Sequence, residues 1–335
     1  MDFGHYPCFG RSQLDGHFPR DAVAFHRFNG ATLTTRVCRV RSVATVVVLV
    51  LVFALFAVVI ASRAPLAGAS SLPTSAAFYL DIGGSASLGV QPDATATHNQ
   101  RTDRGYSNDL VSIEALKGVT LQLTEIGCSG ETTAAMLVGG DKCYVSPDSQ
   151  LAEAIAFLSV HHDETGLVTI DLGFNDLLGC LHAPSIDSTC VAAKLGLLQQ
   201  QLPEILTDLR AAAGPNTTFI GVGHYNPYLA DEVKGVRGRL FADRSASMIR
   251  SLNTTLGDIY ANDAMPMADV AKLFSLYPDG SVNLPGVGRV TGAVARVCEL
   301  TWMCPRNGKK ANIHPDNAGY LEIAEAIDTV IPPGL

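Results

Sequence analysis

The strongest constraint on this 335-residue chain is an apolar segment near its N-terminus. Residues Val43 to Ala61 carry no charge, and Thr45 is their only polar member. A run of this length suffices to cross the hydrocarbon core of a bilayer as a helix. The sequence therefore predicts a transmembrane helix, or signal anchor, over residues 43–62.

The residues around this segment predict its orientation. Arg36, Arg39 and Arg41 lie just before it, and only Arg63 lies just after it. The positive-inside rule then puts the N-terminus in the cytoplasm and all that follows outside the cell membrane. The alternative is a cleaved signal peptide, because Ala67-Gly68-Ala69 has the small-x-small form that signal peptidases accept. In that case the chain is secreted after cleavage near Ala69.

Composition divides the rest of the chain into parts. Residues 1–42 show no helical or strand periodicity, which predicts a disordered cytoplasmic tail. Residues 63–75 are rich in Ala, Pro, Gly and Ser and indicate a linker. Residues 76–335 remain, roughly 260 residues that a single domain can hold. A net charge of −8 without clustered Lys and Arg argues against a nucleic-acid partner. We expect a monomer.

After the linker, apolar strands alternate with amphipathic helical stretches. Strands are predicted at residues 76–82, 119–126, 167–172 and 218–222. Helices are predicted at residues 106–116, 149–158, 191–213, 240–260 and 319–330, and residues 275–310 as a long irregular loop. Strands separated by helices indicate an α/β fold, in which a parallel sheet with right-handed crossovers has helices on both faces.

Cysteines are distributed on both sides of the apolar segment. Cys8 and Cys38 precede it and would be cytoplasmic thiols, whereas six cysteines follow it. An even number in an exported domain indicates disulfides. Six cysteines can pair in many ways, and proximity along the chain favours Cys128 with Cys143, Cys180 with Cys190, and Cys298 with Cys304. A zinc site is the alternative, but the short C-x-x-C spacing is missing.

Polar groups follow three of the predicted strands. Ser85 follows the first strand, Gly130 the second and Asn175 the third, and His314 lies in a loop before the last helix. The carboxyl ends of parallel strands meet at one edge of the sheet, where ligands bind in open α/β folds. A hydroxyl, an imidazole and hydrogen-bond donors are the groups that acyl transfer by a serine requires.

The order of these four positions resembles the GDSL or SGNH hydrolase family over residues 76–330. The family has Gly-Asp-Ser after the first strand, a glycine after the second, Gly-x-Asn-Asp after the third and Asp-x-x-His-Pro late in the chain. The resemblance implies that Ser85 is the nucleophile and His314 the general base. It also implies an oxyanion hole made of the Ser85 N–H, the Gly130 N–H and the Asn175 side chain.

The resemblance also implies a fold and an activity. The fold would be a three-layer α/β/α sandwich with a flavodoxin-like parallel sheet. The activity would be hydrolysis of carboxylic esters, lipids or acylated small molecules, through an acyl-enzyme on Ser85, without metal or organic cofactor. Three segments are similar to the disulfide-containing secreted esterases and lipases of actinobacteria: Gly127 to Thr133, Tyr225 to Tyr228, and Trp302 to Cys304.

Two positions depart from the family pattern. Gly84 stands where the family has Asp, so a side chain that braces the serine turn is missing. Ala311 stands where the family has the Asp that orients the histidine. We expect a Ser-His dyad in which a main-chain carbonyl near Ala311 accepts from Nδ1 of His314, with Asn312 or Asp316 as alternative acceptors. The flanking disulfides would then hold the turn.

Other interpretations stay open at this stage. His224 also follows a strand, and it could line the pocket or replace His314 as the base. The same site could deacetylate a cell-wall glycan or transfer an acyl group to it. Because the family's two Asp residues are missing at Gly84 and Ala311, a degenerate module that only binds a glycan or lipid is a further alternative.

Overall fold

The computed structural model describes residues 77–140, 142–275, 280–304, 310–333 and 335. The predicted tail (1–42), membrane segment (43–62) and linker (63–75), with Cys8, Cys38 and the cleavage position Ala69, lie outside the described residues. Within them, no helix combines the length and the apolar character needed to span a bilayer.

A five-stranded sheet forms the centre of the described domain, in the order β4-β1-β5-β8-β9. Every neighbouring pair is parallel. The strands are β1 (Ala77–Gly83), β4 (Leu121–Glu125), β5 (Thr165–Asp171), β8 (Thr218–Val222) and β9 (Met267–Ala268). The first four are the predicted strands. The fifth, β9, has only two residues and therefore no periodicity from which to predict it.

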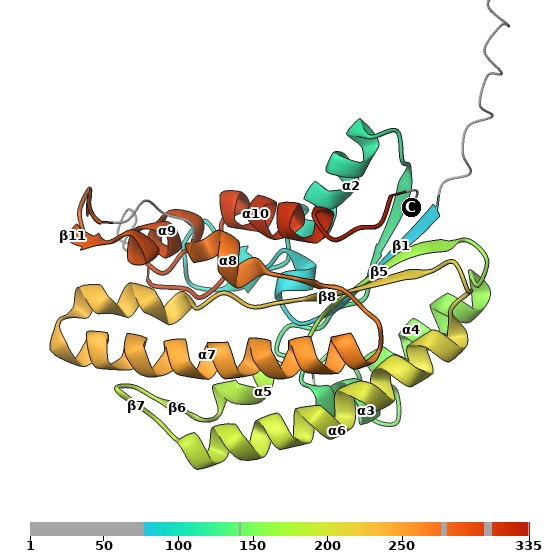
Figure 1. Cartoon of the computed structure of the whole chain (residues 1–335), viewed down its shortest axis with the longest axis horizontal. Helices are drawn as coiled ribbons and strands as arrows, with labels where there is room; N and C mark the ends of the chain where they lie inside the picture. Colours follow the sequence, from blue (N-terminus) through green and yellow to red (C-terminus); the bar gives the residue numbers. More distant parts are fainter. Residues whose placement is uncertain (1–76, 141, 276–279, 305–309, 334) are drawn as a thin grey trace, which may run out of the picture. The chain divides into compact units, whose positions relative to one another are not determined.

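Helices cover both faces of this sheet, which confirms the predicted three-layer α/β/α fold (Figure 1). One face carries α3 (Thr133–Val138), α4 (Gln150–Val160), α5 (Phe174–Leu178), α6 (Ser188–Ala212) and α7 (Val236–Asn262). The other carries α2 (Tyr106–Leu116), α8 (Val270–Ser275), α9 (Gly292–Leu300) and α10 (Asn317–Asp328). Two buried apolar clusters, one on each face, join these helices to the strands.

The strand order explains where a ligand site can form. Chain order reverses beside β1, because β4 lies on one side of it and β5 on the other. In doubly wound sheets the crevice at such a switch point, outside the carboxyl ends of the strands, is the usual ligand site. Gly84 alone separates Ser85 from the end of β1, and Asn175 lies in α5, the helix that follows β5.

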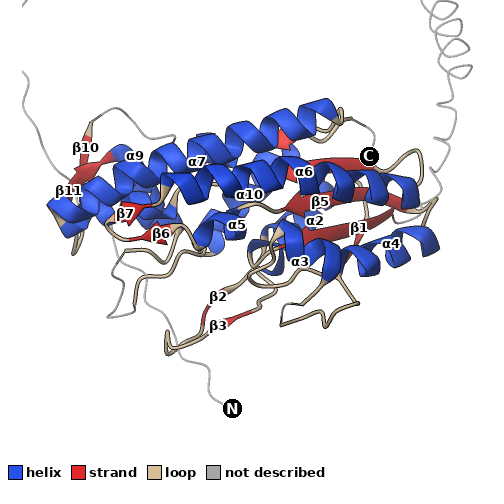
Figure 2. Ribbon diagram, turned by 90° about the horizontal axis from the view of Figure 1, so that it is seen from below, coloured by secondary structure: helices blue, strands red, loops and turns tan. Residues whose placement is uncertain are grey.

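Short elements outside the sheet were not predicted. They are the 3-10 helices η1 (Ala86–Leu88) and η2 (Pro227–Lys234), and the strands β2 (Gln91–Pro92), β3 (Asn99–Gln100), β6 (Leu181–His182), β7 (Ser185–Ile186), β10 (Ser281–Leu284) and β11 (Gly288–Thr291). Figure 2 shows β2 and β3 side by side as a hairpin. The prediction of an irregular loop over 275–310 is wrong where β10, β11 and α9 form. There, Pro285 and Gly286 lie in the turn between β10 and β11.

Candidate active site

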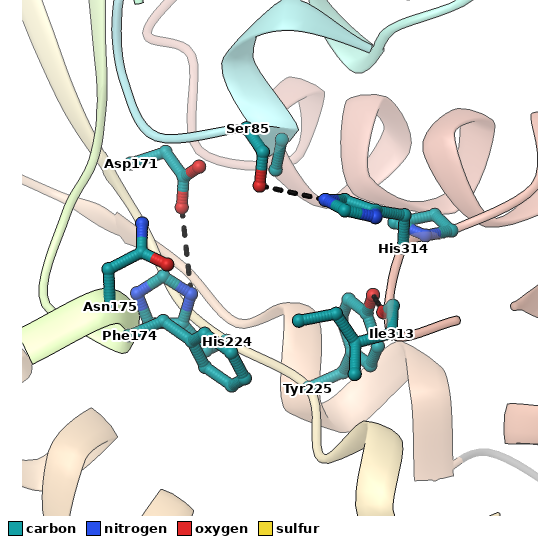
Figure 3. A pocket seen from close by; sticks show the side chains of 10 residues that line it. Ser85, Asp171, Phe174, Asn175, His224, Tyr225, Ile313 and His314 are labelled. Carbon is teal, nitrogen blue, oxygen red and sulfur yellow. Dashed lines mark hydrogen bonds and ion pairs between the residues drawn. The ribbon is translucent and has the colours of Figure 1, made fainter. Parts of the chain in front are cut away.

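A cavity of about 60 Å³ opens at the carboxyl ends of β1 and β5 (Figure 3). One water needs about 10–15 Å³ of such space, so the cavity holds roughly four to six waters. Ser85, Asn175, His224 and His314 all line it. The other lining residues are Ala86, Asp171, Phe174, Tyr225, Ile313 and Pro315.

Ser85 and His314 form a hydrogen bond in this cavity, with 2.9 Å between Oγ and Nε2. On the other side of the imidazole, Nδ1 lies 2.6 Å from Oδ1 of Asn312. The same Oδ1 lies 3.0 Å from the backbone nitrogen of His314. A backbone N–H can only donate, so the Asn312 atom that faces it is the amide oxygen. That oxygen requires a proton on Nδ1, which leaves Nε2 to accept from Ser85.

The acceptor for Nδ1 differs from the one we expected first. We expected a main-chain carbonyl near Ala311, and the structure instead uses the side chain of Asn312, one of the two alternatives. Asn312 bonds the backbone N–H two residues ahead, a turn that Asn and Asp favour. This turn brings the amide oxygen beneath the imidazole, so a neutral amide occupies the orienting position.

Contacts from three other segments hold the histidine loop. Asn99 in β3 accepts from Nδ2 of Asn312 at 2.6 Å, which keeps Oδ1 turned toward His314. The hydroxyl of Tyr225 donates to the carbonyl of Ile313 at 2.5 Å. Trp302 pairs with the loop through its backbone, because its N–H donates to the carbonyl of His314 and its carbonyl accepts from Asn312.

His314 is buried, with only 7% of its surface exposed. Burial disfavours the charged imidazolium and lowers the pKa of His314 to about 4. The neutral form that can accept a proton from Ser85 is therefore present at neutral pH.

The serine turn is held by side chains that the sequence did not identify. Gln150 bonds both backbone groups of Gly83, with Oε1 at 2.7 Å from its nitrogen and Nε2 at 3.1 Å from its oxygen. Ser87 donates to the carbonyl of Gly84 at 2.8 Å. Gly83 has a φ of +137°, and a Cβ there would lie 2.2 Å from the carbonyl oxygen of Asp171. Only glycine fits this close approach of β1 to β5.

The three predicted oxyanion donors are placed differently. Ser85 and Asn175 line the cavity. Nδ2 of Asn175 donates to the carbonyl of Glu131 at 2.9 Å, which leaves the second N–H of this amide for a ligand. Gly130 precedes Glu131 in the exposed loop after β4 and is not among the cavity-lining residues. Its role as a donor stays a prediction.

Asp171 is a cavity residue that sequence reasoning missed. It is the last residue of β5 and is buried, as is His224, which follows β8. Oδ1 of Asp171 lies 3.5 Å from Nδ1 of His224. Burial raises the pKa of Asp171, and the neighbouring His224 lowers it. The one available signal was an acidic residue at the end of a strand whose other members are mostly apolar.

His224 lines the cavity, as one of our two interpretations predicted. Its Nε2 lies 2.8 Å from the carbonyl of Leu172, and its Nδ1 faces Asp171. Both ring nitrogens are thus engaged, whereas the Ser85 hydroxyl bonds His314. This geometry favours His314 over His224 as the base.

The structure contains the three disulfides that proximity favoured: Cys128–Cys143, Cys180–Cys190 and Cys298–Cys304. The first tethers the loop that carries Gly130. The second joins the segment after α5, which bears Asn175, to α6. The third joins α9 to the segment before the histidine loop.

Known structures with a similar chain course include several lipases and esterases. A phospholipase A1 from Streptomyces albidoflavus NA297 is 17% identical over 76% of this chain and 100% of its own, with a TM-score of 0.48. An extracellular lipase from Streptomyces rimosus is 19% identical over 75% and 100%, with a TM-score of 0.46. An aryl esterase from M. smegmatis is 17% identical over 76% and 98%, with a TM-score of 0.40.

The neighbours also include a member of the lipolytic protein G-D-S-L family from Veillonella parvula DSM 2008, 13% identical with a TM-score of 0.43. No protein-family model and no curated protein matches the sequence. A proposal for the function of this chain therefore has to rest on the geometry of the site itself.

Proposed function

We propose that this chain is a serine esterase that hydrolyses carboxylic esters in the cavity around Ser85. The observation that carries the proposal is the line of hydrogen bonds from Ser85 Oγ to His314 Nε2 and from His314 Nδ1 to Asn312 Oδ1. This line supplies a nucleophile, a base and a group that fixes the tautomer of the base, which are the parts of an activated serine.

The proposed reaction follows from these positions. Ser85 Oγ attacks the ester carbonyl carbon while its proton passes to Nε2 of His314. The Ser85 N–H and the free N–H of Asn175 stabilise the tetrahedral oxyanion, with the Gly130 N–H as a third donor. His314 then gives the proton to the leaving alcohol. Water, deprotonated by His314, then attacks the acyl carbon. The bond to Ser85 Oγ breaks, His314 returns the proton to Oγ, and the carboxylic acid is released.

The size of the cavity supports short acyl groups. Its volume of about 60 Å³ matches a few waters, and its lining includes Phe174, Tyr225, Ile313 and Pro315. These side chains are largely apolar, as a short acyl chain requires.

We further propose that the domain works outside the cytoplasm, anchored by residues 43–62. Three disulfides within the described domain support an oxidising compartment. Cell fractionation and mass measurement of the mature N-terminus test this proposal: a chain that retains residues 43–62 in the membrane supports the anchor, and a chain that begins near residue 70 supports secretion.

A fluorophosphonate probe and p-nitrophenyl esters of increasing length test the activity of the full-length protein. We expect labelling of Ser85, turnover of acetate and butyrate above palmitate, and loss of both signals in Ser85→Ala. Acyl transfer to glycan without hydrolysis would favour a transferase. A folded protein that is neither labelled nor active would favour a binding module and contradict the proposal.

A further inference from the structure

A buried ion-pairing couple, Asp171 and His224, shares the cavity with Ser85 and Asn175. The two side chains are 8% and 9% exposed, and 3.5 Å separates Oδ1 of Asp171 from Nδ1 of His224. Figure 3 shows Asp171 beside Ser85, with Asn175 and His224 below it. A carboxylate at this position lies near the serine turn, and its charge acts on the oxyanion that forms during the reaction.

Asp171 contacts the serine turn through its main chain. The N–H of Gly84 donates to the main-chain carbonyl of Asp171 at 3.0 Å. A Cβ at Gly84 would lie 2.8 Å from Nδ2 of Asn175 and 3.8 Å from Oδ2 of Asp171. An Asp at position 84 would therefore crowd the amide of Asn175. Asp171 thus places a carboxyl group from β5 near Gly84.

The same position makes an unpaired carboxylate harmful to catalysis. Asn175 Nδ2 and Asp171 Oδ2 flank the same point at Gly84, and Asn175 is the donor that we assign to the oxyanion. Two like charges close together in a buried site repel strongly. A negative Asp171 without a partner would oppose the negative charge that develops on the substrate oxygen.

His224 provides the compensation. The carbonyl of Leu172 can only accept, so Nε2 of His224 carries a proton. Nδ1 lies 3.5 Å from the Asp171 carboxyl. The couple has no net charge when one further proton is shared between them, either as an N–H on Nδ1 toward a carboxylate or as a protonated carboxyl that donates to Nδ1. Asn253 fixes His224 further, because its side chain bonds both the N–H and the carbonyl of this residue.

We propose that His224 is a positioning residue that neutralises Asp171, so that this buried carboxyl lies beside Ser85 and Asn175 without opposing the oxyanion. The inference rests on the ester hydrolysis proposed above. It deepens that function by adding an electrostatic requirement on the wall of the cavity that lies across from His314.

Three variants of the full-length protein test the inference: His224→Gln, Asp171→Asn and the double variant. Gln and Asn keep hydrogen-bonding groups in place, so the main change is charge. We expect kcat to fall about 10- to 100-fold in His224→Gln with KM nearly unchanged, because only the transition state carries the oxyanion. Asp171→Asn should lose less. The double variant should recover at least about fivefold over His224→Gln, because its carboxylate is gone.

A purely structural role predicts the opposite order. If both side chains only pack, the losses add, and the double variant is the least active of the three. That order in an active wild-type protein would overturn the inference and leave the esterase proposal intact. The exposed couple His162 and Asp163, at the opposite edge of the sheet, is the matched control, since His162→Gln and Asp163→Asn should leave kcat unchanged.

An independent measurement does not depend on activity. Imidazole ¹⁵N and carboxyl ¹³C chemical shifts at neutral pH report the protons on His224 and Asp171. We expect one proton shared by Nδ1 and the carboxylate, in addition to the proton on Nε2. An ionised Asp171 beside a His224 ring protonated only at Nε2 would contradict the inference. The measurement uses the wild-type protein and needs no turnover, so its outcome is independent of the esterase proposal and of how the variants fold.

Discussion

Two histidines face the same cavity, and the groups behind them differ. His314 has a neutral amide, Asn312, at Nδ1 and the Ser85 hydroxyl at Nε2. His224 has the Asp171 carboxylate at Nδ1 and a main-chain carbonyl at Nε2. Of the two rings, only His314 has a nitrogen directed at the serine hydroxyl. The difference indicates two roles: the His314 ring transfers a proton, and the His224 ring neutralises the charge of Asp171.

The two loops are also held in different ways. His224 lies two residues after β8, and Asn253 in α7 bonds its backbone N–H and carbonyl. The His314 loop is held by side chains from Asn99 and Tyr225, which lie outside its own segment. Changes at Asn99 therefore reach the base and not its counterpart.

The largest expected effect separates the two rings. His314→Ala removes the base and should lower kcat by about 10²- to 10⁴-fold, which is the usual contribution of general base catalysis. The loss should exceed that of His224→Gln. Rates of p-nitrophenyl acetate hydrolysis and of fluorophosphonate labelling measure it, with exposed His182→Ala as the unaffected control. A greater loss at His224 would reverse the assigned roles.

The next effect concerns the neutral amide behind His314. Asn312→Ala removes the acceptor that stabilises the imidazolium as it forms. A hydrogen bond to a charged group contributes about 1.5–3 kcal/mol, and each ~1.4 kcal/mol of barrier is tenfold in rate. We therefore expect kcat to fall about 10- to 100-fold. Unchanged kinetics would mean that the tautomer of His314 is fixed by another group.

The pH profile sharpens the contrast in partners. Burial lowers the pKa of His314 to about 4, and a protonated ring cannot accept from Ser85. The kcat/KM value should therefore hold as pH falls through 6 and decline only near pH 4. Asn312→Asp puts a carboxylate at Nδ1, which raises the pKa of His314 and moves this decline to higher pH. A wild-type decline near pH 6.5 would contradict the desolvated base.

The smallest expected effect concerns Asn99, which contacts His314 only through Asn312. Asn99→Ala removes the acceptor for Nδ2 of Asn312 at an exposed position. Because a neutral hydrogen bond contributes about 0.5–1.5 kcal/mol, kcat should fall about two- to tenfold. Thr97→Ala in the same hairpin is the control and should leave kcat unchanged. A loss as large as that of Asn312→Ala would mean that the hairpin alone orients the amide.

The fold was largely predictable because its long elements have strong periodicity. Helix α2 begins and ends at the predicted residues, and β8 also matches. Strand β9 and the hairpins were missed because elements of a few residues show no period. Tertiary contacts, and not local propensity, form them.

The candidate site was predictable only where motifs carry it. Ser85, Asn175 and His314 come together in the cavity as the resemblance implied. Asn312 was placed second to a backbone carbonyl, because the sequence does not reveal how a turn orients an amide. Asp171 and Gln150 were missed, since each contacts the serine turn from another element through hydrogen bonds that form only on folding.

Ser85 and His314 are 229 positions apart in the sequence, yet their side chains share a hydrogen bond. Contacts between such distant residues require the closure of a long loop, so they tend to form late in folding. During synthesis the serine emerges well before the histidine that is to activate it. The proposed hydrolysis therefore begins only when the two ends of the domain have met, and turnover of an ester reports that folding is complete.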